Sequence, residues 1–181
     1  KVLWKDDFMK NNGGQANQGY YCYVDKHSNY WVLTTGNIFV FDEKDKIWYK
    51  NLNSYLASLG IAPLPDGMQV WDVCMDQRGW IWLATDHQGI FVIDTKNKEV
   101  KNFVNNKFDA TSISENTQKK LMLDKTGNMW IACYRNGLNQ YIEKLLGFNT
   151  LELGDVNTTT VDAAGNYWFG TDNRGIIRYD R

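Results

Sequence analysis

Asp162-Ala-Ala-Gly-Asn-Tyr-Trp168 is one of four copies of a pattern in which an aspartate precedes a tryptophan by six positions. The other copies run from Asp25 to Trp31, from Asp76 to Trp82 and from Asp124 to Trp130. Consecutive motif tryptophans lie 51, 48 and 38 residues apart, so the motif is constant while the chain between motifs varies. Such spacing indicates a supersecondary unit that recurs along the chain and is joined by variable loops.

The second copy shows how one unit is built. Residues Val70–Met75 alternate in polarity, Asp76–Gly79 has the composition of a turn, and Trp80–Ala84 is continuously apolar and rich in strand-forming residues. Two further runs, Ile90–Ile93 and Glu99–Val104, follow after turn sequences of their own. Strand-like runs separated by short turns predict four antiparallel strands in each unit.

The second strand of each unit is apolar on both faces, as Met129–Ala132 and Tyr167–Phe169 show. A strand of this kind must be covered on both sides. Four-stranded sheets stacked around an axis provide that cover, so we predict an all-β fold, a β-propeller of four-stranded antiparallel blades. About four blades are present, and the pattern predicts one propeller segment over residues 1–181 with blades near 19–50, 68–104, 117–148 and 156–181.

The last predicted blade ends after its third strand. An orphan strand near Val2–Lys5 is the candidate that completes it, so we expect a strand within residues 1–8 to supply the missing fourth position. That arrangement would seal a four-bladed ring and remove open sheet edges. The alternatives are a segment cut from a larger ring and completion by another chain, and both leave open whether the protein is a homo-oligomer.

The motif residues have structural explanations. The aspartate that begins the first turn can accept hydrogen bonds from backbone N–H groups, and Gly127 and Gly165 can adopt a positive φ. Each motif tryptophan is predicted to pack between sheets. The turns lack the ligand set of a calcium loop, and the odd number of cysteines, without a Cys-x-x-Cys pair, indicates neither a zinc site nor a disulfide framework. We therefore expect no metal and no cofactor.

Composition excludes several classes of function. The net charge is −1 and the cations are scattered, which argues against nucleic-acid binding. No apolar run approaches the roughly 20 residues that span a bilayer, and the N-terminus does not resemble a signal peptide. The chain begins with Lys1 rather than Met, so we expect a processed or excised segment of a longer protein. The three cysteines, Cys22, Cys74 and Cys133, are expected to be small buried apolar residues.

The extended pattern, Asp-x-x-Gly-Asn-x-Trp-(Ile or Phe)-(Gly or Ala)-Thr-x-x-x-Gly-(Leu or Ile)-x-x-Tyr-Asp, resembles the two-component regulator propeller repeat. Asp162–Asp180 fits it almost throughout, and Asp76–Asp94 and Asp124–Tyr141 fit well, with Cys133 in place of Thr. The first copy departs more, since Ser28 stands where Gly is usual. The resemblance implies part of a seven-bladed propeller in the periplasmic sensor region of a Bacteroides-type hybrid histidine kinase.

Strand direction places the loops between blades and the second turn within each blade on one rim. The loop after the first blade, residues 51–69, carries Leu52, Tyr55, Leu56 and Leu59 at helical spacing and predicts a short packed helix. The second turns offer charged, amide and aromatic groups suited to a sugar or its carboxylate. These candidate ligand-binding residues are Asp86, His87, Tyr134, Arg135, Asn136, Asp172, Asn173 and Arg174.

The sequence favours an oligosaccharide-sensing segment of a signalling receptor, whose other partners are the remainder of that receptor and neighbouring propeller blades. A protein-docking propeller is the alternative. A glycan-active lyase or hydrolase is less favoured, because the two histidines, His27 and His87, are predicted in turns on opposite faces. We predict that the segment is not an enzyme, and that any kinase activity lies in other parts of the protein.

Overall fold

The computed structural model describes residues 7–13, 19–143 and 147–179. The chain divides into two compact units, Lys1–Val70 and Trp71–Arg181. The predicted strand at Val2–Lys5 lies outside the described residues. Where the sequence predicted the end of that strand, Phe8 begins a short helix, α1, Phe8–Asn11.

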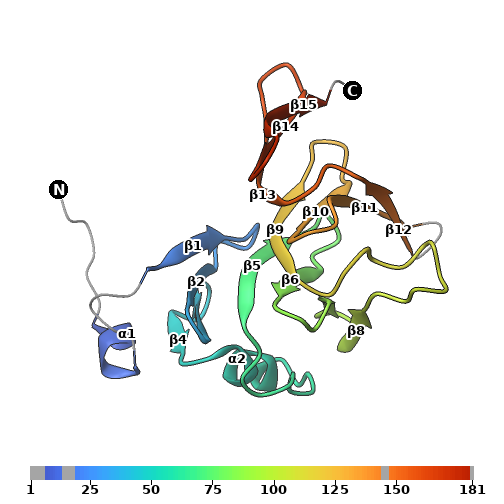
Figure 1. Cartoon of the computed structure of the whole chain (residues 1–181). Coiled ribbons are helices and arrows are strands. Elements are labelled where there is room, and N and C mark those ends of the chain that lie inside the picture. The colour runs from blue at the N-terminus through green and yellow to red at the C-terminus, as the bar shows by residue number, and fades with distance from the viewer. Residues whose placement is uncertain (1–6, 14–18, 144–146, 180–181) are drawn as a thin grey trace. The chain divides into compact units, whose positions relative to one another are not determined.

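The first unit contains one antiparallel sheet with strands in the order β1-β2-β3-β4, coloured blue to cyan in Figure 1. Its strands are β1 Tyr21–Val24, β2 Tyr30–Thr34, β3 Asn37–Asp42 and β4 Ile47–Tyr49. The predicted rim helix is present as α2, Leu52–Ser58, and it begins with a capping box formed by Asn51 and Ser54. Tyr55 is buried, and its ring lies 5.3 Å from that of Trp31, so the helix extends the core of the sheet.

The second unit holds three sheets, each with strands in sequence order. The first consists of β5 Val70–Met75, β6 Ile81–Thr85, β7 Ile90–Asp94 and β8 Glu99–Phe103. The next consists of β9 Gln118–Leu123, β10 Met129–Cys133, β11 Leu138–Ile142 and β12 Gly147–Leu151. The last consists of β13 Val156–Val161, β14 Tyr167–Thr171 and β15 Gly175–Tyr179. All pairings are antiparallel, which confirms the predicted all-β, bladed architecture.

Apolar side chains join consecutive blades of the second unit into continuous cores. One cluster combines Trp82 and Ile90 with Met129 and Ile131, and a second combines Trp130 and Leu138 of the middle sheet with residues of the last sheet. Strand β10 contributes Met129 and Ile131 to the first cluster and Trp130 and Ala132 to the second, so it is buried throughout. Face-to-face packing of successive sheets is the arrangement expected of propeller blades.

The motif aspartate is the centre of the first turn in every blade. One carboxylate oxygen accepts the indole N–H of the motif tryptophan at 2.9, 3.1, 3.0 and 2.9 Å in successive copies. The other accepts the backbone N–H of the residue four positions after the aspartate, at 2.9–3.0 Å. The indole bond has no counterpart among the sequence predictions, which treated the tryptophans as packing groups alone. One side chain thus fixes both the turn and the rotamer of the tryptophan.

The motif tryptophans differ in burial. Trp31 and Trp82 are 0% exposed and Trp130 is 4% exposed. Trp168, in the last sheet, is half-buried, with the Arg178 guanidinium 5.8 Å from the ring centroid. The last blade therefore has one face on which the repeat is less well covered.

A buried aspartate links the inner strands of two blades. Asp72 on β5 is 1% exposed, and its carboxylate accepts the backbone N–H of Leu121 at 2.9 Å and lies 3.3 Å from the Lys120 ammonium. Burial raises the pKa of Asp72, while the bonds from Leu121 and Lys120 oppose that rise. Strand β9 lies at the edge of its sheet, and the Leu121 N–H has no partner within that sheet. The Asp72 carboxylate satisfies this backbone donor.

The degraded first copy of the motif stores backbone strain. Ser28 has φ 66°, in the left-handed region, where the second, third and fourth copies have glycine with φ 93°, 89° and 92°. A left-handed residue with a Cβ costs about 1–2 kcal/mol, and part of that is offset because glycine loses more entropy on folding. We expect Ser28→Gly to raise the free energy of unfolding by roughly 0.5–1 kcal/mol, measured by urea denaturation.

The reverse substitution provides a matched control. At Gly165, φ is 92° and an added Cβ would meet nothing within 4 Å, so Gly165→Ser changes only the backbone strain. It should destabilise the chain by a similar amount. If Ser28→Gly lowers stability, Ser28 makes a contribution to the turn that backbone strain does not describe.

Candidate functional site

A threonine hydroxyl holds the second turn of the blade in three of the copies. In the first copy, Thr34 Oγ1 donates to the carbonyl of Asn37 at 3.1 Å. Thr85 Oγ1 donates to the carbonyl of Gly89 at 2.6 Å, and Thr171 Oγ1 donates to that of Gly175 at 2.9 Å. Gly89 has φ 78°, and a Cβ there would lie 2.1 Å from the carbonyl oxygen of Phe103, so the position admits only glycine. These constraints fix the backbone of turns that carry predicted ligand-binding residues.

In the second unit, turns from two neighbouring blades border a pocket of about 460 Å³. Asp86 and His87 come from the β6–β7 turn, and Tyr134 and Arg135 come from the β10–β11 turn. The remaining wall is formed by the segment leading into β9, through Glu115, Asn116, Thr117 and Lys119. Backbone hydrogen bonds from Gly89 to Asn116 and from Tyr134 to Thr117 attach both turns to this segment, so the walls of the pocket are preorganised.

Two cations of the pocket, Lys119 and Arg135, lie close to aromatic rings: Tyr134, which also lines the pocket, and Trp71, which does not. The Lys119 ammonium lies 3.9 Å from the ring centroid of Trp71 and 5.0 Å from that of Tyr134. The Arg135 guanidinium lies 5.1 Å from the Tyr134 ring. Trp71 and Tyr134 are 40% and 38% exposed, so each ring has a free surface beside a positive charge. Such a combination suits a ligand with both an apolar ring face and a negative group.

The acidic groups of the pocket are already engaged. Asp86 Oδ1 lies 2.9 Å from His87 Nδ1, and Glu115 Oε1 accepts the backbone N–H of Arg135 at 2.7 Å. The cations differ in this respect, because no salt bridge within the described part of the chain involves Lys119 or Arg135. The pocket is thus lined by two carboxylates that accept hydrogen bonds from the chain and by two cations that stand outside any salt bridge of the described residues.

A second pocket of about 410 Å³ adjoins the first and shares Arg135 with it. Asn136 and Arg174 also border it, as do Ser114, Gly137, Thr150, Glu152 and Gly154. The two pockets together form what we call the rim groove, with Arg135 at its centre. Arg174, like Arg135, has no salt bridge among the described residues.

The structure brings six of the eight predicted residues to the rim groove: Asp86, His87, Tyr134, Arg135, Asn136 and Arg174. Asp172 and Asn173 line neither pocket, and the Asp172 carboxylate instead accepts a hydrogen bond from the Asn157 side chain. Sequence reasoning missed Lys119, which lines the groove, and Trp71, which lines neither pocket but lies against the Lys119 ammonium. Both lie on the first strand of a blade, and the prediction considered only the turns.

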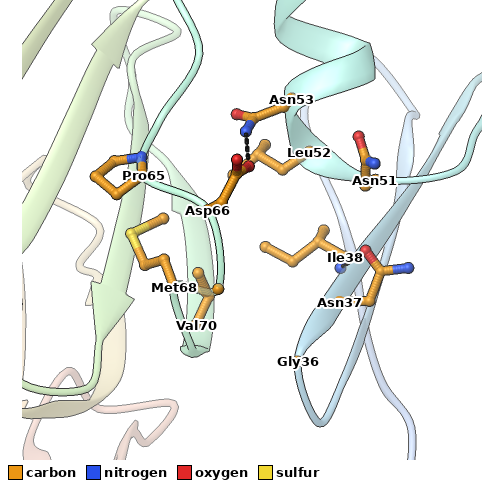
Figure 2. A pocket seen from close by; sticks show the side chains of 11 residues that line it. Gly36, Asn37, Ile38, Asn51, Leu52, Asn53, Pro65, Asp66, Met68 and Val70 are labelled. Carbon is orange, nitrogen blue, oxygen red and sulfur yellow. Dashed lines mark hydrogen bonds between the residues drawn. The ribbon is translucent and has the colours of Figure 1, made fainter.

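A smaller pocket of about 210 Å³ lies in the first unit, between the start of α2 and the chain before β5 (Figure 2). Asn53 and Asp66 point toward each other at this pocket, and Asn53 Nδ2 donates to Asp66 Oδ1 at 3.3 Å. The Asn53 amide also donates to the Leu64 carbonyl and accepts from the Leu64 N–H. These polar groups fasten the loop to the helix, which is a structural role.

The described residues contain no group of three or more His, Cys, Asp and Glu side chains that could hold a metal ion. Cys74 and Cys133 are buried as predicted, but Cys22 is exposed, which corrects the expectation for that residue. Burial raises the pKa of the Cys133 thiol to about 12. None of the described helices is long and apolar enough to cross a membrane.

Repeated Asp–Trp turns, four-stranded antiparallel blades and shared cores between blades define a segment of a β-propeller. Residues 63–87 match the model of the two component regulator propeller family, so the resemblance of the repeat is confirmed and the chain carries this repeat. No curated protein matches the chain in sequence.

Solved structures with the same fold include extracellular domains of two hybrid two component systems of B. thetaiotaomicron. The first has a TM-score of 0.67 and 21% sequence identity. The match covers 88% of this chain and 22% of the B. thetaiotaomicron chain. The second has a TM-score of 0.73 and 17% sequence identity. The match covers 94% of this chain and 24% of the second B. thetaiotaomicron chain. A protein described as a gluconolactonase has a TM-score of 0.57 and 13% identity, with 93% of this chain and 61% of its own covered. The chain thus spans less than a quarter of the two receptor domains.

Proposed function

We propose that the chain is a ligand-sensing segment of the extracytoplasmic, periplasmic region of a two-component signalling receptor, and that its ligand is an acidic oligosaccharide bound in the rim groove. The repeat and the likeness to the B. thetaiotaomicron domains support the receptor context. On this proposal the rest of the receptor, including any kinase, lies in other parts of the protein, and the segment itself catalyses no reaction.

The observation that carries the ligand class is the set of cations in the rim groove. Lys119, Arg135 and Arg174 form no salt bridge within the described chain, while Arg78 elsewhere in the same unit binds both Asp76 and Glu143. Arginine offers forked donors that match a carboxylate or sulfate group. An exposed aromatic face beside such a cation also accommodates the apolar side of a sugar ring, so a uronate or sulfated sugar uses both features.

The size of the groove agrees with an oligosaccharide rather than a single small anion. Two adjoining pockets of about 460 and 410 Å³ meet at Arg135, and ligand sites of this kind are commonly about 300–1,000 Å³. Arg135 and Arg174 both border the second pocket. Charges spaced along the groove favour a chain with more than one acidic unit.

We expect a galacturonate trisaccharide to raise the melting temperature of the chain and its neutral galactose counterpart to raise it less. Ligand at about 100 times its Kd stabilises the folded state by roughly 2.7 kcal/mol. Arg135→Ala should weaken binding of the acidic probe by about 10- to 100-fold, because a charge-assisted hydrogen bond contributes about 1.5–3 kcal/mol. Calorimetric titration measures both affinities.

Lys125→Ala is the matched control, since this exposed cation lies in the first turn of the same blade, at the other end of strand β10. It should leave binding unchanged.

A docking function is the alternative, and Phe108, 99% exposed in the loop between β8 and β9, is the observation that favours it. If uronate-bearing, sulfated and neutral oligosaccharides all fail to change the melting temperature, the sensing proposal is wrong and docking is preferred.

A further inference from the structure

The third blade carries a buried amide at a position where the other blades are apolar. Asn139 on β11 is 0% exposed and pairs with Ile131, the residue directly after the motif tryptophan. The residues in the same register of the other blades are Phe39, Phe91 and Ile177. Because a buried amide is costly unless it is hydrogen-bonded, the partners of Asn139 indicate what the substitution provides.

All four hydrogen-bonding positions of the Asn139 amide are used. Its Oδ1 accepts the Ser114 backbone N–H at 3.1 Å and the Thr150 hydroxyl at 2.9 Å. Its Nδ2 donates to the Ser114 hydroxyl at 2.8 Å and to Cys133 Sγ at 2.9 Å. A backbone N–H can only donate, so Ser114 fixes which side of the amide is the oxygen. Asn139 therefore imposes one direction on each hydrogen bond around it.

The two hydroxyls that Asn139 contacts both line the second pocket of the rim groove. Thr150 directs its proton to Asn139, since an amide oxygen can only accept. Ser114 directs its proton to the Asn136 carbonyl at 3.0 Å. With both protons used inside the protein, each hydroxyl offers a ligand only lone pairs. Glu152 adds a carboxylate to the same pocket, and this group also accepts.

The arginines of this pocket have the opposite character. Arg135 and Arg174 carry only N–H donors, so they bind an acceptor such as a carboxylate. A ligand that satisfies both sets of groups carries an anion for the arginines and hydroxyl donors for the hydroxyl and carboxylate oxygens. A uronic acid has both on one ring. An anion without hydroxyl groups, such as sulfate, leaves the acceptors of the pocket unpaired.

We propose that the second pocket is a hydroxyl-reading subsite, in which Ser114 and Thr150 accept hydrogen bonds from ring hydroxyls of a uronic acid whose carboxylate binds Arg135 or Arg174. Asn139 lines neither pocket and is a positioning residue, which acts by fixing the proton of each hydroxyl. The inference rests on the proposed sensing function. It narrows the ligand from acidic sugars in general to uronates with free ring hydroxyls.

Calorimetric titration with two probes tests this subsite. One probe is a galacturonate trisaccharide, and the other is the same trisaccharide with its hydroxyls converted to methyl ethers. Both carry the carboxylates, but only the first can donate hydroxyl hydrogen bonds, so the chain should bind it more tightly. In Thr150→Val this preference should fall about three- to tenfold, because valine keeps the shape of threonine and removes the acceptor. A preference caused by the bulk of the methyl groups would not change.

Asn139→Leu tests the positioning role. It gives the third blade an apolar residue, as in the other blades, and releases the two hydroxyls from their fixed directions, so the preference for the first probe should fall here too. A general loosening of the blade weakens both probes alike and leaves their ratio unchanged. Thr160→Val, at an exposed position of β13 outside both pockets, is the matched control and should keep the full preference. The melting temperature of each variant without ligand shows whether it folds, and Thr150→Val carries the test if Asn139→Leu does not.

The subsite and the sensing function fail in different ways. Equal affinity for the two probes, or a preference that Thr150→Val leaves unchanged, overturns the subsite and leaves sensing intact. Binding of a sulfated oligosaccharide without binding of the galacturonate trisaccharide also overturns the subsite alone. If no oligosaccharide binds, both proposals are wrong.

Discussion

Trp82→Ala is expected to lower the free energy of unfolding by roughly 3–5 kcal/mol, the largest effect expected of a single substitution in this chain. The Trp82 side chain is 0% exposed and packs 4.9 Å from the Tyr141 ring of the next blade. Its removal leaves a cavity between two sheets. It also deprives the Asp76 carboxylate of the indole N–H that lies 3.1 Å away. Urea denaturation followed by circular dichroism measures the change.

Trp168→Ala is the matched comparison, since Trp168 occupies the same position in its motif and makes the same bond to its aspartate, at 2.9 Å. Trp168 is half-buried on a face where Ile176 is exposed, so less apolar surface is lost. We expect about half the effect of Trp82→Ala. Equal losses at the two positions would show that the carboxylate bond, rather than packing between blades, dominates the role of the tryptophan.

Asp124→Asn is expected to cost about 2–3 kcal/mol at neutral pH. The Asp124 carboxylate accepts the indole of Trp130, the hydroxyl of Tyr167 and the backbone N–H of Asn128. An amide has one oxygen and one NH₂ group, so at least one of these donors meets another donor. The substitution therefore disrupts the first turn of the third blade and its connection to the fourth blade together.

The same substitution should change how stability depends on pH. Burial opposes the ionisation of Asp124, but the hydrogen bonds from Trp130, Tyr167, Thr126 and Asn128 outweigh it and hold the pKa of this carboxyl well below its ordinary value. A group whose pKa is lower in the folded state stabilises the protein above its unfolded pKa, which is about 3.9 for aspartate. That contribution is lost as the pH falls from about 4 toward the folded-state pKa.

Stability should therefore decline less steeply below about pH 4 in Asp124→Asn than in the unchanged chain. Asp72 acts in the opposite direction: its raised pKa gives stability at low pH that is lost as the pH rises through the folded-state value. For this reason the test compares the free energy of unfolding of Asp124→Asn with that of the unchanged chain, measured by urea denaturation at each pH. Glu99→Gln, on the exposed end of β8, removes one carboxylate elsewhere and should leave the decline unchanged. A steep decline retained in Asp124→Asn would contradict the prediction.

The architecture was accessible from the sequence because the repeat fixes it locally. Strand periodicity and turn composition lie within a few residues of one another, and four copies of the motif make each assignment support the others. Helix α2 was predicted for the same reason, since its apolar residues follow a helical spacing. The indole–carboxylate bond was not, because a tryptophan six positions after an aspartate indicates neither the rotamer nor the hydrogen bond.

The candidate site could be predicted only in part. Strand direction placed the second turns of the blades on one rim, which was enough to select Arg135 and Arg174. Lys119 escaped selection because it reaches the rim groove from a strand position that only three-dimensional register reveals, and the contact of its ammonium with Trp71 was missed for the same reason. The absence of Asp172 from the groove reflects a contact with Asn157 that depends on the pairing of β13 and β14.

The exposed thiol of Cys22 offers a chemical reporter within the unmodified chain. Cys74 and Cys133 are buried, so a thiol reagent under native conditions should label one position of the folded chain. Cys22 pairs with Val32, and Val24 pairs with Tyr30, so the thiol points from the same side of the first sheet as the Tyr30 ring. The alkylation rate of Cys22 would therefore report how accessible that side of the sheet is, without a dye, a tag or a substitution.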